Sequence, residues 1–135
     1  MSGIRIAGYA SLFGVADSGG DTVVAGAFAG AAAPLPLLWQ HDMREPIGFV
    51  ESLAEDARGL RVVARIVATG RGADAAALVR AGALDGLSFG YRVRAARPGP
   101  GGRRLERLEL IEISLVTLPM QAGARVLGWQ EEQAQ

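Results

Sequence analysis

The chain has no cysteine, no lysine and a single histidine among its 135 residues. Without cysteine it can have no disulfide, no thiolate nucleophile and no cysteine-ligated zinc. Without lysine it can have no Schiff-base chemistry, no phosphate-loop lysine and no serine–lysine dyad. One histidine also excludes a multi-histidine metal site. Proton transfer near neutral pH therefore depends on His41 or on a carboxylate with a perturbed pKa.

Excess charge of either sign is absent as well, because 14 arginines balance 14 acidic residues. This balance argues against a protein that binds nucleic acid or a membrane surface over most of its face. Half of the residues are hydrophobic, which is typical of a folded chain, and 135 residues suffice for one domain with a real core. No apolar run is long enough to span a membrane and no targeting pattern is present, so we expect a soluble intracellular protein.

Alternation of apolar and polar side chains predicts a β-rich domain. The expected strands, with turns at 55–59 and 98–102, cover residues 4–12, 35–41, 46–55, 59–68, 87–96 and 104–118. One helix is expected over 72–81, with Asp74 in its first turn and Gly82 just beyond its end. Residues 128–135 lack periodicity and are expected to form a loose tail that folding does not need. The predicted fold class is β-rich α+β, with an antiparallel barrel or sandwich.

Residues 86–90 (GLSFG) match the G-x-S-x-G pattern of a nucleophile elbow around Ser88. An α/β-hydrolase has its acid and then its histidine after the serine, whereas the only histidine here lies 47 residues before Ser88. The following segment, YRVRAAR, has the pattern of a strand and not of a helix. The two glycines are better explained by close approach of other backbone. Alone, the motif is more typical of a serine at the start of a strand than of a nucleophile.

His41 follows the apolar segment 37–40 (LLWQ). A lone histidine beside a tryptophan is more often a packed structural residue, but the end of an apolar run can also stand at the rim of a cavity. Asp42 is more typical of a turn than of a partner for His41, because adjacent residues of a strand point to opposite faces. The pattern leaves both roles of His41 open.

Glu112 lies in the most β-prone segment of the chain, residues 110–117 (LIEISLVT). Glu112 and Ser114 share one face of that strand, and both faces are mostly apolar, which is typical of a buried central strand. A buried carboxylate is costly without a partner, and the single imidazole is the obvious candidate. The alternative is an edge strand with Glu112 in solvent, and the sequence favours neither.

Two further patterns have ordinary structural explanations. Residues 70–75 (GRGADA) match a dinucleotide-binding fingerprint in outline, but the flanking hairpins leave no room for the parallel sheet that this fingerprint requires. We interpret them as a glycine turn that opens a helix. Residues 92–107 carry a net charge of +5, from six arginines against Glu106. This basic finger could grip nucleic acid or an acidic protein tail, although such a run is more often a solvated turn.

Four blocks of the sequence, in order, resemble the phage prohead protease family of the HK97 type. Any one block is weak evidence, but four in register over residues 8–124 are specific. Gln121 stands where the family commonly has asparagine, a departure that concerns a local turn contact. The blocks are GYASLFGVADSGGD with VAGAF at 24–28, LLWQHDMREPIG at 37–48, GALDGLSFGY at 82–91 and LELIEISLVTLPMQAGA at 108–124.

The resemblance implies the fold of the herpesvirus assembly proteases, an antiparallel β-barrel with one or two flanking helices. It implies a protease domain over residues 1–127, followed by a polar tail over 128–135. The viral enzymes use a Ser-His-His triad, and this chain has no second histidine. The third member must then be an acid, which the family's acid block places at Glu112. The implied catalytic residues are Ser88, His41 and Glu112, with no metal and no cofactor, and the oxyanion hole is expected from nearby backbone N–H groups.

The function implied is that of a serine endopeptidase in capsid maturation of a tailed phage or phage-like particle. The expected substrates are the N-terminal scaffold segment of the major capsid protein, a separate scaffold protein and the protease itself. We expect further copies of the chain as partners, no membrane or nucleic-acid partner, and a location inside the assembling prohead in the host cytoplasm. Two alternatives remain: a non-catalytic capsid- or scaffold-binding module with a decayed site, and a small G-x-S-x-G esterase, against which the missing downstream histidine counts.

Overall fold

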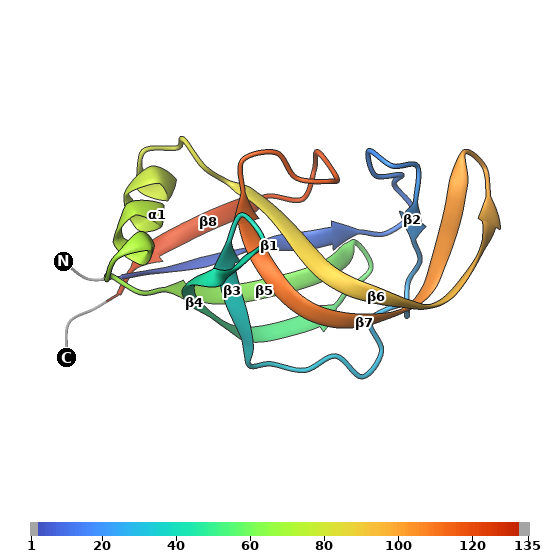
Figure 1. The fold of residues 1–135 in the computed structure, drawn as a ribbon, viewed down its shortest axis with the longest axis horizontal. Helices are drawn as coiled ribbons and strands as arrows, with labels where there is room; N and C mark the ends of the chain where they lie inside the picture. Colours follow the sequence, from blue (N-terminus) through green and yellow to red (C-terminus); the bar gives the residue numbers. More distant parts are fainter. Residues whose placement is uncertain (1–2, 133–135) are drawn as a thin grey trace.

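The computed structural model describes residues 3–132, which form one mixed sheet of eight strands and one ten-residue helix (Figure 1). No helix in this part of the chain is long and apolar enough to cross a membrane. The elements are β1 Ile4–Leu12, β2 Thr22–Val23, β3 Leu35–Trp39, β4 Asp42–Glu55, β5 Gly59–Ile66, α1 Arg71–Arg80, β6 Gly86–Gly99, β7 Gly102–Val116 and β8 Val126–Glu131.

Strand β7 organises the sheet, because it pairs with three other strands. The antiparallel hairpin partner β6 lies along one of its edges. Along its other edge lie β2 and β3, both parallel to it. From β3 the sheet continues through β4, β5, β1 and β8, each antiparallel to the one before. Figure 1 shows α1 at one end of the molecule and the tip of the β6–β7 hairpin at the other.

Several predictions from periodicity are confirmed. The first strand covers residues 4–12 as expected, with Ile4 and Ile6 in the core. The helix begins one residue earlier than predicted, has Asp74 in its first turn, and is followed by Gly82 with a φ of +75°. Its buried face is made of small residues and Val79, which lets it pack closely against β4 and β5.

Strands β6 and β7 have one face in the core and one face outside it. Leu87, Ile113 and Leu115 belong to the central apolar cluster. The alternate positions therefore face the other way, and two of them, Glu112 and Ser114, are nevertheless buried. Buried polar side chains on the outer face of a sheet need partners, so this face is where a functional site is to be expected.

The described strands do not close into the barrel that the resemblance implies. The edge strands β6 and β8 approach each other only at one end, where the N–H groups of Leu87 and Val126 donate to carbonyls across the gap (2.9 and 2.7 Å). Farther along β6, Phe89 and Tyr91 line a small cavity closed on its other side by the loop 14–21. Because side chains and a loop occupy this gap, no strand ladder joins the two edges there. The two parallel pairings of β7 also depart from a purely antiparallel sheet.

The loose tail expected from residue 128 is wrong for residues 128–131, which belong to β8. This strand adds to the outer edge of β1, with Trp129 opposite Ile6 and Gly128 opposite Ala7. The segment has no apolar alternation because only Val126 packs against the core, so backbone pairing and not side-chain burial defines the strand. Residues 133–135 lie outside the described part of the chain.

Removal of β8 should therefore destabilise the fold. A chain that ends at Arg125 loses the β1 ladder and the burial of Val126, and its free energy of unfolding should fall by at least about 1.5 kcal/mol. The matched control ends at Glu132 and keeps the strand. Urea unfolding of both truncated chains measures the difference, and equal stability of the two would show that β8 contributes nothing to folding.

Candidate active site

His41 lies in a tight turn between β3 and β4. Trp39 and Asp42 are paired across the hairpin, so Gln40 and His41 form a two-residue turn, and both have positive φ, +52° and +60°. This is the geometry of a type I′ turn, which normally favours asparagine and glycine. A residue with a side chain in this region costs on the order of 1 kcal/mol or more, and such strain is found most often at functional sites.

Because β3 pairs with β7, this turn lies next to Glu112. Leu37 lies opposite Ile113 and Trp39 opposite Leu115, so the chain leaves β3 beside the C-terminal half of β7. There His41 Nδ1 and Glu112 Oε1 are 2.5 Å apart. The sequence left open whether Glu112 is buried and paired or exposed. The structure shows it buried, with its side chain 5% exposed and bound to the only imidazole of the chain.

A fully buried serine completes this contact. The Ser114 hydroxyl donates to the second carboxylate oxygen, Glu112 Oε2, at 2.7 Å. The oxygen of this hydroxyl, Ser114 Oγ, also accepts a hydrogen bond from the backbone N–H of His41 at 3.0 Å. The sequence places Ser114 on the same face as Glu112 but indicates no role for it. The spacing of two residues from Glu112 is the available signal, and only the pairing of β7 with β3 shows that Ser114 binds the backbone of His41.

The charge of Glu112 acts on His41. The hydrogen bond to Glu112 raises the pKa of the His41 imidazole above its ordinary value, burial of the ring opposes this, and the negative charge of Glu112 adds to the increase. With Nδ1 engaged by the carboxylate, Nε2 is the ring nitrogen left to accept a proton. The side chain of His41 is 41% exposed, so a substrate can contact the imidazole from solvent.

Ser88 lies on the neighbouring strand at the same height. In the β6–β7 ladder Ser88 is opposite Ser114, and Gly90 is opposite Glu112. Side chains of directly opposite residues have Cβ atoms about 4.5–5.5 Å apart. Ser88 therefore lies beside Ser114, whose hydroxyl binds the backbone N–H of His41. Ser88 is 4% exposed, and among the described residues its hydroxyl makes no hydrogen bond, with His41 or any other group. Hydrogen bonds between catalytic groups are often long in a free enzyme and shorten when substrate binds.

The two glycines around Ser88 are explained by close approach, as the sequence indicates for Gly86. A Cβ at Gly86 would lie 2.4 Å from the backbone oxygen of Val116. A Cβ at Gly90 would lie 2.6 Å from Glu112 Oε1, which is a side-chain contact and not a backbone one. The second glycine of the motif therefore makes room for the carboxylate.

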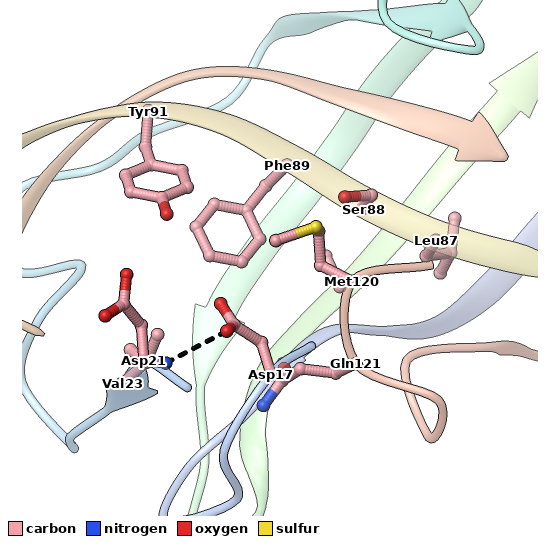
Figure 2. A pocket seen from close by; sticks show the side chains of 10 residues that line it. Asp17, Asp21, Val23, Leu87, Ser88, Phe89, Tyr91, Met120 and Gln121 are labelled. Atoms are coloured by element: carbon pink, nitrogen blue, oxygen red, sulfur yellow. Dashed lines mark hydrogen bonds between the residues drawn. The ribbon is translucent and has the colours of Figure 1, made fainter. Parts of the chain in front are cut away.

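A small cavity borders Ser88 on the core side of β6. Figure 2 shows Phe89 and Tyr91 projecting from β6 toward the loop that carries Asp17 and Asp21. Neither carboxylate is free: Asp17 Oδ1 accepts the Asp21 N–H at 3.0 Å, and Asp21 is paired with Arg103. The acidic groups of this cavity therefore have structural roles, whereas His41, Glu112 and Ser114 contact one another on the outer face of the sheet.

The other candidates have structural roles. Asp42 Oδ1 accepts the backbone N–H of Arg44 at 2.9 Å, which makes it a turn residue as expected. The buried amide of Gln121 fixes the loop after β7 to the end of β1, because its Oε1 accepts the Leu12 N–H at 2.8 Å. Half of the arginines in the basic finger are paired with acids, namely Arg94 with Glu109, Arg97 with Glu106 and Arg103 with Asp21. In the described part of the chain, no three histidine, cysteine or carboxylate side chains could hold a metal ion together.

A histidine bound to a buried carboxylate, with a serine on the neighbouring strand, presents the residue types that serine proteases use. The fold is similar to that of solved viral proteases. The protease of Kaposi's sarcoma-associated herpesvirus, solved with a hexapeptide phosphonate inhibitor, aligns with a TM-score of 0.64 at 14% identity over 96% of this chain and 66% of that one. A second structure of a KSHV protease aligns with a TM-score of 0.64 at 16% identity over 98% of this chain and 63% of that one.

Sequence comparison gives the family. The model of the caudovirus prohead serine protease family matches residues 1–134, and the chain belongs to this family. It is 36% identical to the prohead protease of Enterobacteria phage HK97 over 127 residues, which is 86% of this chain and 56% of that protein. It is 31% identical to the capsid polyprotein of Pseudomonas phage PAJU2 over 102 residues, 69% of this chain and 15% of that protein. The chain thus spans about half of the first relative and a small part of the second.

Proposed function

We propose that the chain is a serine endopeptidase that cleaves capsid scaffold segments during prohead maturation, with Ser88, His41 and Glu112 as its catalytic residues. The observation that carries the proposal is the contact of His41 Nδ1 with the buried Glu112, two ladder pairs away from Ser88. Membership of the prohead serine protease family supports the same conclusion independently.

In the proposed mechanism, Ser88 Oγ attacks the scissile carbonyl carbon while its proton passes to His41 Nε2. Glu112 holds the imidazole in the tautomer with Nδ1–H and stabilises the imidazolium that forms. His41 then delivers the proton to the leaving amine, and water cleaves the acyl-enzyme by the same route. Backbone N–H groups near Ser88 are the proposed donors to the oxyanion, with Arg92 as a secondary candidate.

The proposed substrates are the N-terminal scaffold segment of the major capsid protein, scaffold protein and the protease itself. The relative in phage PAJU2 supports this, since a segment similar to this chain is part of a capsid polyprotein there. An enzyme with these substrates acts inside the assembling prohead in the host cytoplasm, and we propose that it does so as a homo-oligomer.

A fluorophosphonate probe separates an enzyme from a non-catalytic module on the same fold. We expect the probe to label Ser88, and labelling to disappear in Ser88→Ala and to fall strongly in His41→Ala. Ser52→Ala is the matched control, because Ser52 is an exposed serine on β4. Labelling that is unaffected by loss of His41 would exclude the proposed base. A folded protein that takes no label at Ser88 would favour the binding module, whereas turnover of esters but not peptides would favour the esterase.

The pH dependence of cleavage should report the raised pKa of His41. A protonated imidazole cannot accept the Ser88 proton, so kcat/KM should fall as the pH drops through the pKa of His41 in the free enzyme. Because the bond to Glu112 raises that pKa, the midpoint should lie above the ordinary value of about 6.5. A pH profile of peptide cleavage measures it, and a midpoint at or below about 6.5 would contradict the coupling.

The raised pKa of His41 also determines how the free energy of unfolding changes with pH. A histidine whose pKa is raised on folding stabilises the folded state fully below about pH 6.5, and this stabilisation is lost as the pH rises through the raised pKa. Urea unfolding of the wild type across this range should show a decrease that Glu112→Gln lacks.

A further inference from the structure

The turn that carries His41 is held by β7 and by Thr117, the residue that follows this strand. The Gln40 N–H donates to the Leu115 carbonyl at 2.9 Å, which continues the β3–β7 pairing by one residue. The Gln40 side chain donates to Thr117 Oγ1 at 2.7 Å and accepts from the Thr117 N–H at 3.1 Å. Ser114 stands one position before Leu115 on β7, and its Oγ accepts a hydrogen bond from the N–H of His41. A turn with two residues at positive φ is strained, so these contacts are what keeps it in place.

Ser114 differs from the other anchors because it touches two catalytic residues with one hydroxyl. The Ser114 hydroxyl donates a hydrogen bond to Glu112 Oε2 and accepts one from the backbone N–H of His41. The donor and acceptor capacity of the hydroxyl is thereby used to set the imidazole and the carboxylate relative to each other. Ser114 is fully buried, at 0% exposure, and its proton is committed to Glu112, so it is not itself a nucleophile.

We propose that Ser114 is a positioning residue of this active site, which holds His41 and Glu112 in register, and that Gln40 is the second anchor of the same turn. The proposal rests on the proposed function, because position matters for catalysis only if His41 is the base. Loss of the Ser114 hydroxyl leaves a buried carboxylate oxygen and a backbone N–H without these partners, and the strained turn is then free to shift.

We expect Ser114→Ala to lower kcat about 100-fold and to leave KM within about twofold. A displacement on the order of 1 Å at the reacting groups costs about this much in rate. Substrate binding depends on other surfaces, so KM should change little. Ser11→Ala is the matched control: Ser11 is also 0% exposed, but its hydroxyl has no hydrogen-bond partner among the described residues.

The deciding measurement is an NMR titration of His41 in the full chain, prepared without a histidine tag. Because the sequence has one histidine, its ring gives one unambiguous set of signals. In Ser114→Ala we expect the pKa of His41 to fall toward the ordinary value of about 6.5 and the Nδ1 proton signal to be lost by exchange. In Ser11→Ala both should remain as in the wild type.

A merely structural Ser114 would lower the melting temperature without moving the His41 titration or the kcat of the folded fraction, and that result would overturn the proposal. A His41 pKa that rises in Ser114→Ala would also overturn it, since the hydroxyl would then only weaken the charge of Glu112. If Ser114→Ala does not fold, Gln40→Ala serves in its place, because Gln40 is only partly buried; a shifted titration supports the proposal and an unchanged one overturns it.

The titration also separates this proposal from the proposed function. It needs no substrate, so a shifted His41 pKa in a protein that neither cleaves nor labels would support Ser114 as the residue that positions the imidazole while the endopeptidase assignment fails.

Discussion

Replacement of Ser88 with alanine should abolish cleavage of the capsid protein and leave the fold intact. The proposed chemistry has no other nucleophile, since the chain lacks cysteine and Ser114 is buried with its proton bound to Glu112. Loss of the nucleophile in a serine protease lowers kcat by about 10⁶-fold. The fold should tolerate the change, because the Ser88 hydroxyl has no hydrogen bond in the described structure that its removal would break.

The measurement is co-expression with a candidate capsid protein, followed by the intact mass of that capsid protein. His41→Ala should behave in the same way, and the double variant should be no worse than either single variant, because members of a triad act as a unit. Capsid protein at its cleaved mass in the presence of Ser88→Ala would remove Ser88 from the mechanism. The mass of the protease chain in the same samples tests self-cleavage, since only the active form can trim itself.

Local patterns in the sequence predict most of the strands, and for a physical reason. Alternation over residues 4–12 and 59–66 reflects one face of each strand in the core, which is a property of neighbouring residues. The same reasoning finds both faces of the segment around Glu112 mostly apolar, but leaves open whether that strand is central and buried or lies at an edge. It cannot decide whether the carboxylate has a partner, because the partner, His41, lies 71 residues away in sequence.

The features that the sequence does not predict depend on long-range pairing. The expected strand 35–41 ends at Trp39, and the strand expected from residue 46 begins at Asp42. The two residues between them form a turn without the asparagine and glycine that normally mark one. Strand β8 has no apolar alternation because only Val126 of this strand packs against the core. The role of Ser114 requires the parallel pairing of β3 with β7, which no local pattern encodes.

Glu112→Gln should reduce cleavage steeply, by as much as about 10⁴-fold, with a smaller effect on folding. The amide retains the shape of the side chain and can still accept a hydrogen bond through its oxygen. It carries no negative charge, and its N–H₂ group can favour the wrong tautomer of His41, which is the cause of the loss when the acid of a serine protease triad becomes an amide. Folding should suffer less, because a neutral amide is cheaper to bury than a carboxylate. Rates of peptide cleavage by the purified variant measure the loss.

Glu109→Gln is the matched control for this experiment, because Glu109 lies on the same strand but is exposed and paired with Arg94. It should cleave at the rate of the wild type. In Glu112→Gln the acid limb of the pH profile should also move down toward about 6.5, since the bond that raises the pKa of His41 is changed and the charge is gone. A near-wild-type rate for Glu112→Gln would show that the contact with His41 does not serve catalysis. The acid would then have to lie elsewhere, and Asp42→Asn would be the next variant to measure.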